Sequence, residues 1–127
     1  MKSTANQPSQ RMLRVAEQIK HVLAEQLLRG HFNNPLLLDT ASSVTVTEVR
    51  VSPDLKHAAA YVISLGGQNM EEILPALNEE AGAFQKEVSR QTQLKFTPRI
   101  QFRMDDTFDR AARLDSIFHT LKYSDQE

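Results

Sequence analysis

Cysteine is absent from this chain of 127 residues, and aromatic residues make up only 6% of it. Without cysteine the protein has no disulfide framework, no thiol nucleophile and no thiolate metal site. No apolar run approaches the roughly 20 residues that a membrane-spanning helix needs, and residues 1–10 lack the apolar stretch of a secretory signal. These absences favour a cytoplasmic protein, and the length suits a single domain with a genuine core.

An excess of charge of one sign is also missing, because the formal net charge is −1 at pH 7. The charges are nevertheless unevenly spread, since basic residues predominate in residues 1–31 and 86–103. Acidic residues gather at Glu71, Glu72, Glu79 and Glu80, and again at Asp105, Asp106 and Asp109. A near-neutral total is therefore compatible with a dipolar surface whose basic parts steer anionic partners.

Apolar residues recur at intervals of three and four from residue 10 to residue 29, which predicts an amphipathic helix. Gly30 is suited to ending this helix, and residues 31–43 are predicted to form a loop that contains the apolar patch Leu36-Leu37-Leu38. The predicted buried stripe of the helix consists of Leu13, Ala16, Ile19, Leu23 and Leu27.

The run from Val44 to Ile63 predicts a β-hairpin, because valine and threonine dominate its first half and suit a pleated, half-buried surface. The turn is expected at Ser52-Pro53-Asp54, where proline presets φ and aspartate bonds to nearby backbone. The apolar phase changes between Val46 and Val49, which predicts a β-bulge near Thr47-Glu48. Period two places these second-strand residues on one face: Ala59, Tyr61, Ile63 and Leu65.

A second helical region follows the hairpin. Asn69 is its expected N-cap, with Glu72 three residues on as in a capping box, although Pro75 leaves open a start nearer to that proline. Gly82 lies within the helical pattern and predicts a kink or a close backbone approach. The apolar stripe of this region consists of Ile73, Leu77, Ala81, Phe84 and Val88.

Pro98 interrupts the chain before a third predicted strand, Arg99 to Met104, whose alternation produces one apolar and one basic face. The last predicted element is a helix from Thr107 to Tyr123. The order α-β-β-α-(kink)-α-β-α predicts an α+β domain, a three-stranded sheet with helices packed on one face. We expect one domain at residues 10–123, a disordered lead at residues 1–9 and a short tail at residues 124–127.

Three stretches carry a family resemblance. They begin with Arg11-Met-Leu-Arg14, with Val46-Thr-Glu-Val49 and with Leu94-Lys95-Phe96, and they extend to Ile19, Val62 and Phe102. In this order, and inside an element order that matches the second type of K-homology fold, they resemble the bacterial ribosome-binding factor A family. The resemblance spans residues 10–121, which is nearly the whole chain.

The resemblance implies a protein that binds the free small (30S) ribosomal subunit and assists late maturation of its 16S RNA near the 5′ end, often in the cold. It implies a non-enzymatic monomer without cofactor, membrane contact or small-molecule substrate. The family lacks the Gly-x-x-Gly loop of ordinary K-homology domains, and none occurs between the second and third helices here. The family carries a small-x-Gly kink instead, which corresponds to Ala81-Gly82-Ala83.

Basic residues of the first helix and of residues 86–103 are candidate RNA contacts, because lysine and arginine bind phosphate and release its counterions. The ordinary alternative is a solvated charged surface. Tyr61 and Phe102 fall on predicted strands, where bases can stack, but core packing is the favoured interpretation for both. The candidate contacts are Arg11, Arg14, Lys86, Arg90, Lys95, Arg99 and Arg103.

No sequence motif indicates catalysis or a metal site. The histidines lack metal-ligand spacing, and there is no Walker loop, nucleophile elbow or dinucleotide fingerprint. Two alternatives stay open. One is a protein-interaction module without direct RNA contact, which would use Leu36-Leu37-Leu38. The other is a small metal-dependent hydrolase near Asp105, Asp106 and Asp109, although aspartate at a helix start more often serves as a cap.

Overall fold

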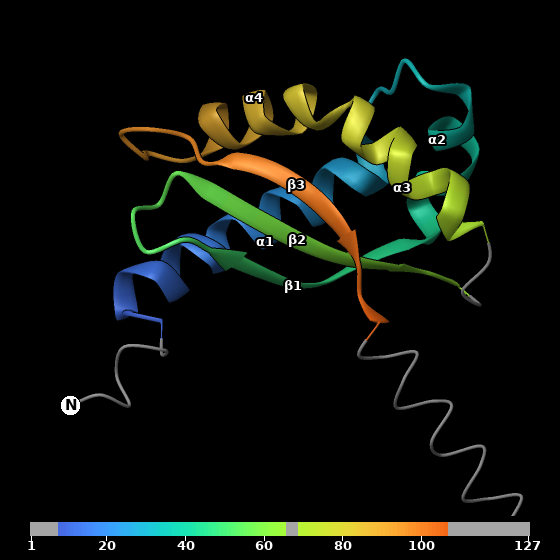
Figure 1. Cartoon of the computed structure of the whole chain (residues 1–127). Helices are drawn as coiled ribbons and strands as arrows, with labels where there is room; N and C mark the ends of the chain where they lie inside the picture. Colours follow the sequence, from blue (N-terminus) through green and yellow to red (C-terminus); the bar gives the residue numbers. More distant parts are fainter. Residues whose placement is uncertain (1–7, 66–68, 107–127) are drawn as a thin grey trace, which may run out of the picture.

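A computed structural model describes residues 8–65 and 69–106 (Figure 1). The predicted helix from Thr107 to Tyr123, the predicted tail and residues 1–7 of the predicted lead lie outside the described residues. The elements are α1 (Gln10–Arg29), α2 (Pro35–Thr40), a short 3-10 helix (Ala41–Ser43), β1 (Val44–Val51), β2 (His57–Ser64), α3 (Met70–Glu79), α4 (Ala81–Gln91) and β3 (Arg99–Met104).

The three strands form one mixed sheet in the order β1-β2-β3. β1 and β2 are the antiparallel arms of the predicted hairpin, and β3 runs parallel to β2. A parallel pair needs a long crossover connection, which α3 and α4 supply on the face of the sheet where α1 also lies (Figure 1). Burial alternates along each strand, so one face is covered by helices and the other is exposed. The prediction of an α+β, K-homology-like fold is confirmed.

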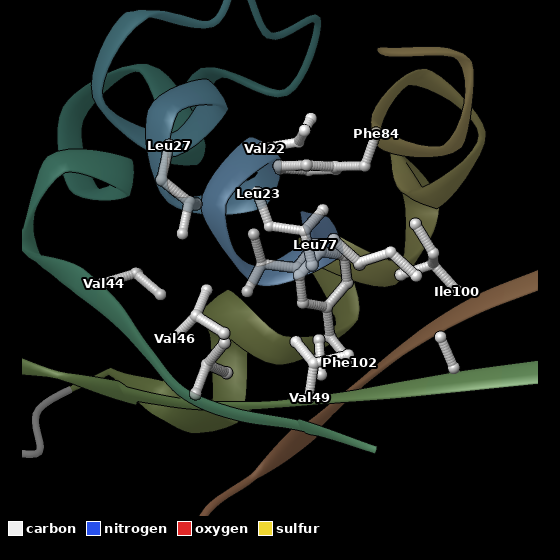
Figure 2. Packing of buried hydrophobic residues seen from close by; sticks show 14 of the residues in the cluster. Val22, Leu23, Leu27, Val44, Val46, Val49, Leu77, Phe84, Ile100 and Phe102 are labelled. Atoms are coloured by element: carbon white, nitrogen blue, oxygen red, sulfur yellow. The ribbon is translucent and has the colours of Figure 1, made fainter. Parts of the chain in front are cut away.

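The core lies between the sheet and the helices. In Figure 2, Val44, Val46 and Val49 of β1 point toward the helical side chains, which include Leu23 and Leu77. Phe84 and Phe102 are almost completely buried, and their ring centroids lie 4.9 Å apart in an edge-to-face arrangement. Such a pair adds stabilisation beyond the area that it buries. The two rings therefore join α4 to β3 across the core.

α1 has the predicted bounds, and its ends are capped. The Ser9 hydroxyl accepts from the N–H of Met12 at 3.1 Å, which satisfies a free donor of the first turn. Gly30 ends the helix with extended backbone, and a Cβ there would meet the carbonyl oxygen of Gln26 at 2.4 Å. Close approach, not a left-handed φ, therefore favours glycine at this position.

The buried stripe of α1 differs from the predicted one at its start. Leu13 is 50% exposed, because Val15 and Val22 face the core and turn Leu13 toward a groove beside the end of α4. The buried residues of α1 are Val15, Ile19, Val22, Leu23 and Leu27.

The predicted loop at residues 31–43 contains helix instead. Asn34 caps α2, its Oδ1 accepting from the N–H of Leu36 at 2.9 Å, and Pro35 occupies the first turn, where its missing N–H costs nothing. Leu37 is completely buried and Leu36 partly so, whereas Leu38 is 63% exposed. The patch Leu36-Leu37-Leu38 belongs mainly to the core, which removes the observation that favoured a protein-interaction module.

The hairpin carries the predicted bulge, because its register shifts between Val46 and Glu48 and leaves Thr47 with no residue opposite it on β2. Its turn is longer than predicted: Ser52 donates its N–H to the carbonyl of His57 at 2.9 Å, and Leu55 has a φ of 60°. Asp54 stabilises this turn, its carboxylate accepting from the Ser52 hydroxyl at 2.6 Å. That hydrogen bond, followed by one from the Lys56 N–H, holds the pKa of Asp54 below its ordinary value.

The helix after the hairpin begins after Asn69, as predicted, but not with the predicted capping box. Asn69 has a φ of 65° and makes no side-chain cap. Pro75 lies inside α3 and does not mark its start. The break between α3 and α4 falls at Glu80, one residue before the predicted kink at Ala81-Gly82-Ala83, which forms the first turn of α4.

Glu80 is a buried anchor at this break. Its carboxylate accepts from the backbone N–H of Asn33 at 2.8 Å and from that of Asn34 at 3.2 Å. The neighbouring Glu79 accepts from the side-chain amide of Asn34 at 3.1 Å. The α3–α4 junction thereby holds the segment that leads into α2, far away in sequence.

The outer edge of β3 is occupied by a side chain of α3. The Asn78 amide donates to the carbonyl of Phe102 at 3.0 Å, and its Oδ1 accepts from the N–H of Phe102 at 2.8 Å. Edge strands present unpaired backbone groups of this kind to other chains. Asn78 imitates a neighbouring strand and satisfies them at this point.

Candidate nucleic-acid interface

The predicted basic contacts are divided between two surfaces. The helical surface comprises Arg11 and Arg14 of α1, Lys86 and Arg90 of α4, and Lys95 in the loop between α4 and β3. The sheet surface is the exposed face of the three strands. It holds Arg99 and Arg103, together with Glu48, Arg50, Ala59, Tyr61 and Gln101.

Grooves run beside the basic residues of the helical surface. One lies between α1 and the end of α4, where Leu13 and Arg14 face Gln91, Thr92 and Gln93. A second lies between α4 and the following loop, and Lys86 and Thr97 line it. Positive charge therefore lies in a groove on each side of α4. Side chains in these positions can contact successive phosphates of a nucleic acid.

Not all of these charges are equally available. Arg90 forms an ion pair with Glu87, and this interaction, with a further hydrogen bond from Gln91, lowers the pKa of Glu87. Arg90 is exposed and Glu87 is partly exposed, so the pair is weak and can be exchanged for phosphate. Within residues 8–65 and 69–106, Arg11, Arg14, Lys86 and Lys95 form no ion pair. Their charges are the more accessible ones for a polyanion.

Parallel pairing of β2 and β3 builds the sheet surface from residues distant in sequence. Tyr61 of β2 lies opposite Glu48 on one side and Arg103 on the other, and the next row holds Arg50, Ala59 and Gln101. The guanidinium carbon of Arg50 lies 5.6 Å from the centroid of the Tyr61 ring. The Arg50 Nε also donates to Glu48 at 2.6 Å. Aromatic and cationic groups therefore meet at the centre of this face.

Tyr61 is half-buried and lies outside the core, which corrects the favoured interpretation. The reason is the period of two, because Ala60 and Val62 on either side of it point inward. Phe102, by contrast, is 1% exposed and confirms its prediction as a core residue.

Sequence reasoning missed Arg50 and Lys56. Arg50 lies between the buried Val49 and Val51, and that alternation was a sufficient signal that it faces outward. Lys56 precedes β2, and its carbonyl accepts from the N–H of Arg99 at 2.8 Å. The hairpin turn, the α4–β3 loop and the start of α1 lie at one end of the molecule (Figure 1). These segments carry Arg11, Lys56 and Lys95.

The described part of the chain holds no group of three histidine, cysteine, aspartate or glutamate residues suited to a metal ion. Asp105 instead accepts a hydrogen bond from the Thr47 hydroxyl, and Asp109 lies outside the described residues. None of the described helices is long and apolar enough to cross a membrane.

The element order, and a mixed three-stranded sheet that carries helices on one face, define a K-homology-like domain of the α+β class. The family model described as ribosome-binding factor A matches residues 11–118 of this sequence. The chain therefore belongs to the ribosome-binding factor A family, a non-enzymatic type of protein.

Individual relatives agree with this assignment. The ribosome-binding factor A of Methylobacterium sp. (strain 4-46) is 49% identical over 115 residues, which are 91% of this chain and 81% of the relative. The crystal structure of ribosome-binding factor A from Thermus thermophilus has a TM-score of 0.61 and 25% identity, covering 73% of this chain and 94% of that one. A homology model of the Thermus thermophilus factor, fitted into a map of its 30S complex, shares the fold with a TM-score of 0.57 and 24% identity over 72% of this chain and 91% of that one.

Proposed function

We propose that this protein binds the free small (30S) ribosomal subunit through its 16S RNA and assists late maturation of that RNA near the 5′ end. It acts without catalysis, as a monomer in the cytoplasm, and serves assembly in the cold. Membership of the ribosome-binding factor A family supports the choice of partner. The main support from this chain's own structure is the cluster of exposed cations around the grooves beside α4.

The helical surface makes the main phosphate contacts. Arg14 and Lys86 border the two grooves, and Arg90 and Lys95 extend the positive field at the C-terminal end of α4, where the start of α1 with Arg11 also lies (Figure 1). Each lysine or arginine that neutralises a phosphate releases counterions, so affinity is expected to fall steeply with salt. This electrostatic binding does not require an overall positive protein, because only the local potential acts at short range.

Binding alone is sufficient for the assembly role. A protein that binds one conformation of an RNA more tightly than another shifts the RNA toward the first by the difference in binding free energy. The packed core holds the backbone beneath the cations in place, so the ordering cost on binding is expected to fall on their side chains and not on the backbone. No step of bond making or breaking is needed.

The test is co-sedimentation of the purified protein with separated small subunits, large subunits and whole ribosomes on a sucrose gradient. We expect the protein with the free small subunit alone. The charge-reversed variant Lys86→Glu/Arg90→Glu/Lys95→Glu should bind more weakly, with the logarithmic salt slope reduced by about one per lost phosphate contact.

The matched control is Lys86→Arg/Arg90→Lys/Lys95→Arg, which exchanges the side chains and preserves every charge. It should keep the wild-type salt slope, because counterion release depends on charge. Wild-type affinity and slope in the charge-reversed variant would show that Lys86, Arg90 and Lys95 do not contact RNA. Absence of the wild-type protein from every ribosomal fraction would contradict the proposed function itself.

A further inference from the structure

We propose that the sheet surface is a second RNA-binding surface, which holds an unpaired segment of RNA with a base stacked on Tyr61. This inference rests on the proposed function for the choice of RNA as the ligand, but it concerns a different layer of the molecule. The helical surface binds phosphates, whereas the sheet surface offers a ring, cations and an amide side by side. The occupant is therefore a single strand whose base is free to stack.

The first observation is the position of the Tyr61 ring. β2 is the central strand, so Tyr61 lies in the middle of the exposed face, between Glu48 of β1 and Arg103 of β3. In the next row along the strands, Ala59 lies between Arg50 and Gln101. A methyl side chain there leaves shallow space beside the ring, at the spacing of alternate residues in a strand, about 7 Å. A flat base needs such space.

The second observation is the balance of charge. Arg50, Arg99 and Arg103 are exposed on this face. Its acidic neighbours are Glu48, which forms an ion pair with Arg50, and Asp105, whose charge also acts on Arg50. In the described part of the chain, Arg99 and Arg103 make no ion pair, and Arg103 donates only to Gln101, at 3.0 Å. The face therefore carries positive charge that the protein does not neutralise among these residues, and it complements a phosphate backbone.

The third observation is that the cationic and aromatic groups are already combined. The Arg50 guanidinium lies against the Tyr61 ring at 5.6 Å from its centroid, and both planes can stack on a base. Gln101 adds an amide that can donate to and accept from a base edge. In a duplex the faces of the bases are stacked on one another and cannot stack on Tyr61. An acidic peptide would be bound by the cations and would not need the ring. The combination therefore favours unpaired RNA over either.

The test is fluorescence anisotropy with short fluorescein-labelled oligouridylate and oligoadenylate, compared with a labelled duplex RNA. Tyr61→Leu removes the ring and should weaken binding of the single strands by about tenfold or more, the value of one stacked base. Tyr61→Phe keeps the ring and should stay close to wild type. Arg103→Glu should weaken binding and flatten the salt dependence.

The matched control is Arg29→Glu, which makes the same charge change in an exposed arginine at the end of α1. It should leave single-strand binding unchanged. Circular dichroism of each variant verifies the fold. Arg103→Glu keeps the proposal falsifiable if Tyr61→Leu unfolds, because that variant must bind single strands more weakly than both wild type and Arg29→Glu.

Equal binding by Tyr61→Leu and wild type, or no binding of either oligonucleotide by the folded wild-type protein, would overturn the proposal. If Tyr61→Leu weakens co-sedimentation with the small subunit while wild type binds no oligonucleotide, the sheet surface contacts the subunit through something other than a single strand, and the proposal is likewise wrong. Co-sedimentation of wild type is scored separately, so the proposed function stands or fails independently of Tyr61.

Discussion

The two faces of the sheet are made by the same strands but differ in burial and in the kinds of side chain that they carry. On the inner face, Ala60, Val62 and Phe102 are almost completely buried and join the helices in one core. On the outer face, one residue further along each strand, lie Tyr61 and Arg103. The difference shows how a period of two gives a single strand one buried face and one exposed face, and we propose RNA binding for the exposed one. Substitutions on the inner face should therefore change unfolding, and those on the outer face should change RNA binding.

The largest expected effect comes from comparing the aromatic residues of the two faces. Phe102→Ala should lower the free energy of unfolding by about 3–5 kcal/mol, because it empties a packed site against Phe84. Tyr61→Ala should cost about 1 kcal/mol or less, since only strand preference and partial packing are lost. Urea denaturation followed by circular dichroism measures both, and equal losses would show that the two faces are not separate.

A smaller effect is expected at the junction of α3 and α4, on the inner side. Glu80→Ala removes the acceptor of the Asn33 and Asn34 N–H groups and should cost about 1–3 kcal/mol. Glu80→Gln retains one acceptor oxygen and should cost less. At a temperature where both variants are folded, anisotropy should show wild-type affinity for single-stranded RNA. A loss of affinity would link the junction to the outer face and break the comparison.

The smallest effect is a gain in stability. Gly82 lies in the first turn of α4, and a Cβ added there would meet nothing within 4 Å. Gly82→Ala should therefore raise the free energy of unfolding by about 0.5–1 kcal/mol, through helix propensity and a less flexible unfolded chain. The thermal midpoint should rise while single-strand binding stays the same. A lower midpoint would show that glycine is required at this position for a reason other than packing space.

Local patterns predicted much of the fold. α1, the hairpin with its bulge, and β3 all follow from periodicity and turn chemistry within a few residues. The short helix α2 was missed although Asn34-Pro35 is a helix-start signal, because the apolar run that follows it is too short to show a period. Asn69 marked the start of α3 correctly, but no side-chain cap forms there.

The sequence predicted which basic residues could contact RNA, but not how they lie relative to one another. Basic patterning pointed to Arg14, Lys86 and Arg103, but it did not show that they lie on two surfaces. The parallel pairing of β3 with β2 decides that Arg103 stands beside Tyr61. Such pairing joins residues far apart in sequence, and no local rule specifies its register.

The sequence by itself determined where α1, the hairpin, β3 and the start of α3 form, because hydrophobic spacing and turn residues act over short range. Only the tertiary structure decided which face of β2 is buried, since both of its alternating sets contain apolar residues. It also decided that the chain breaks at Glu80, where a carboxylate finds two backbone donors from another part of the chain. Burial and long-range hydrogen bonding select among locally equivalent choices, and here that selection placed Tyr61 on the outside.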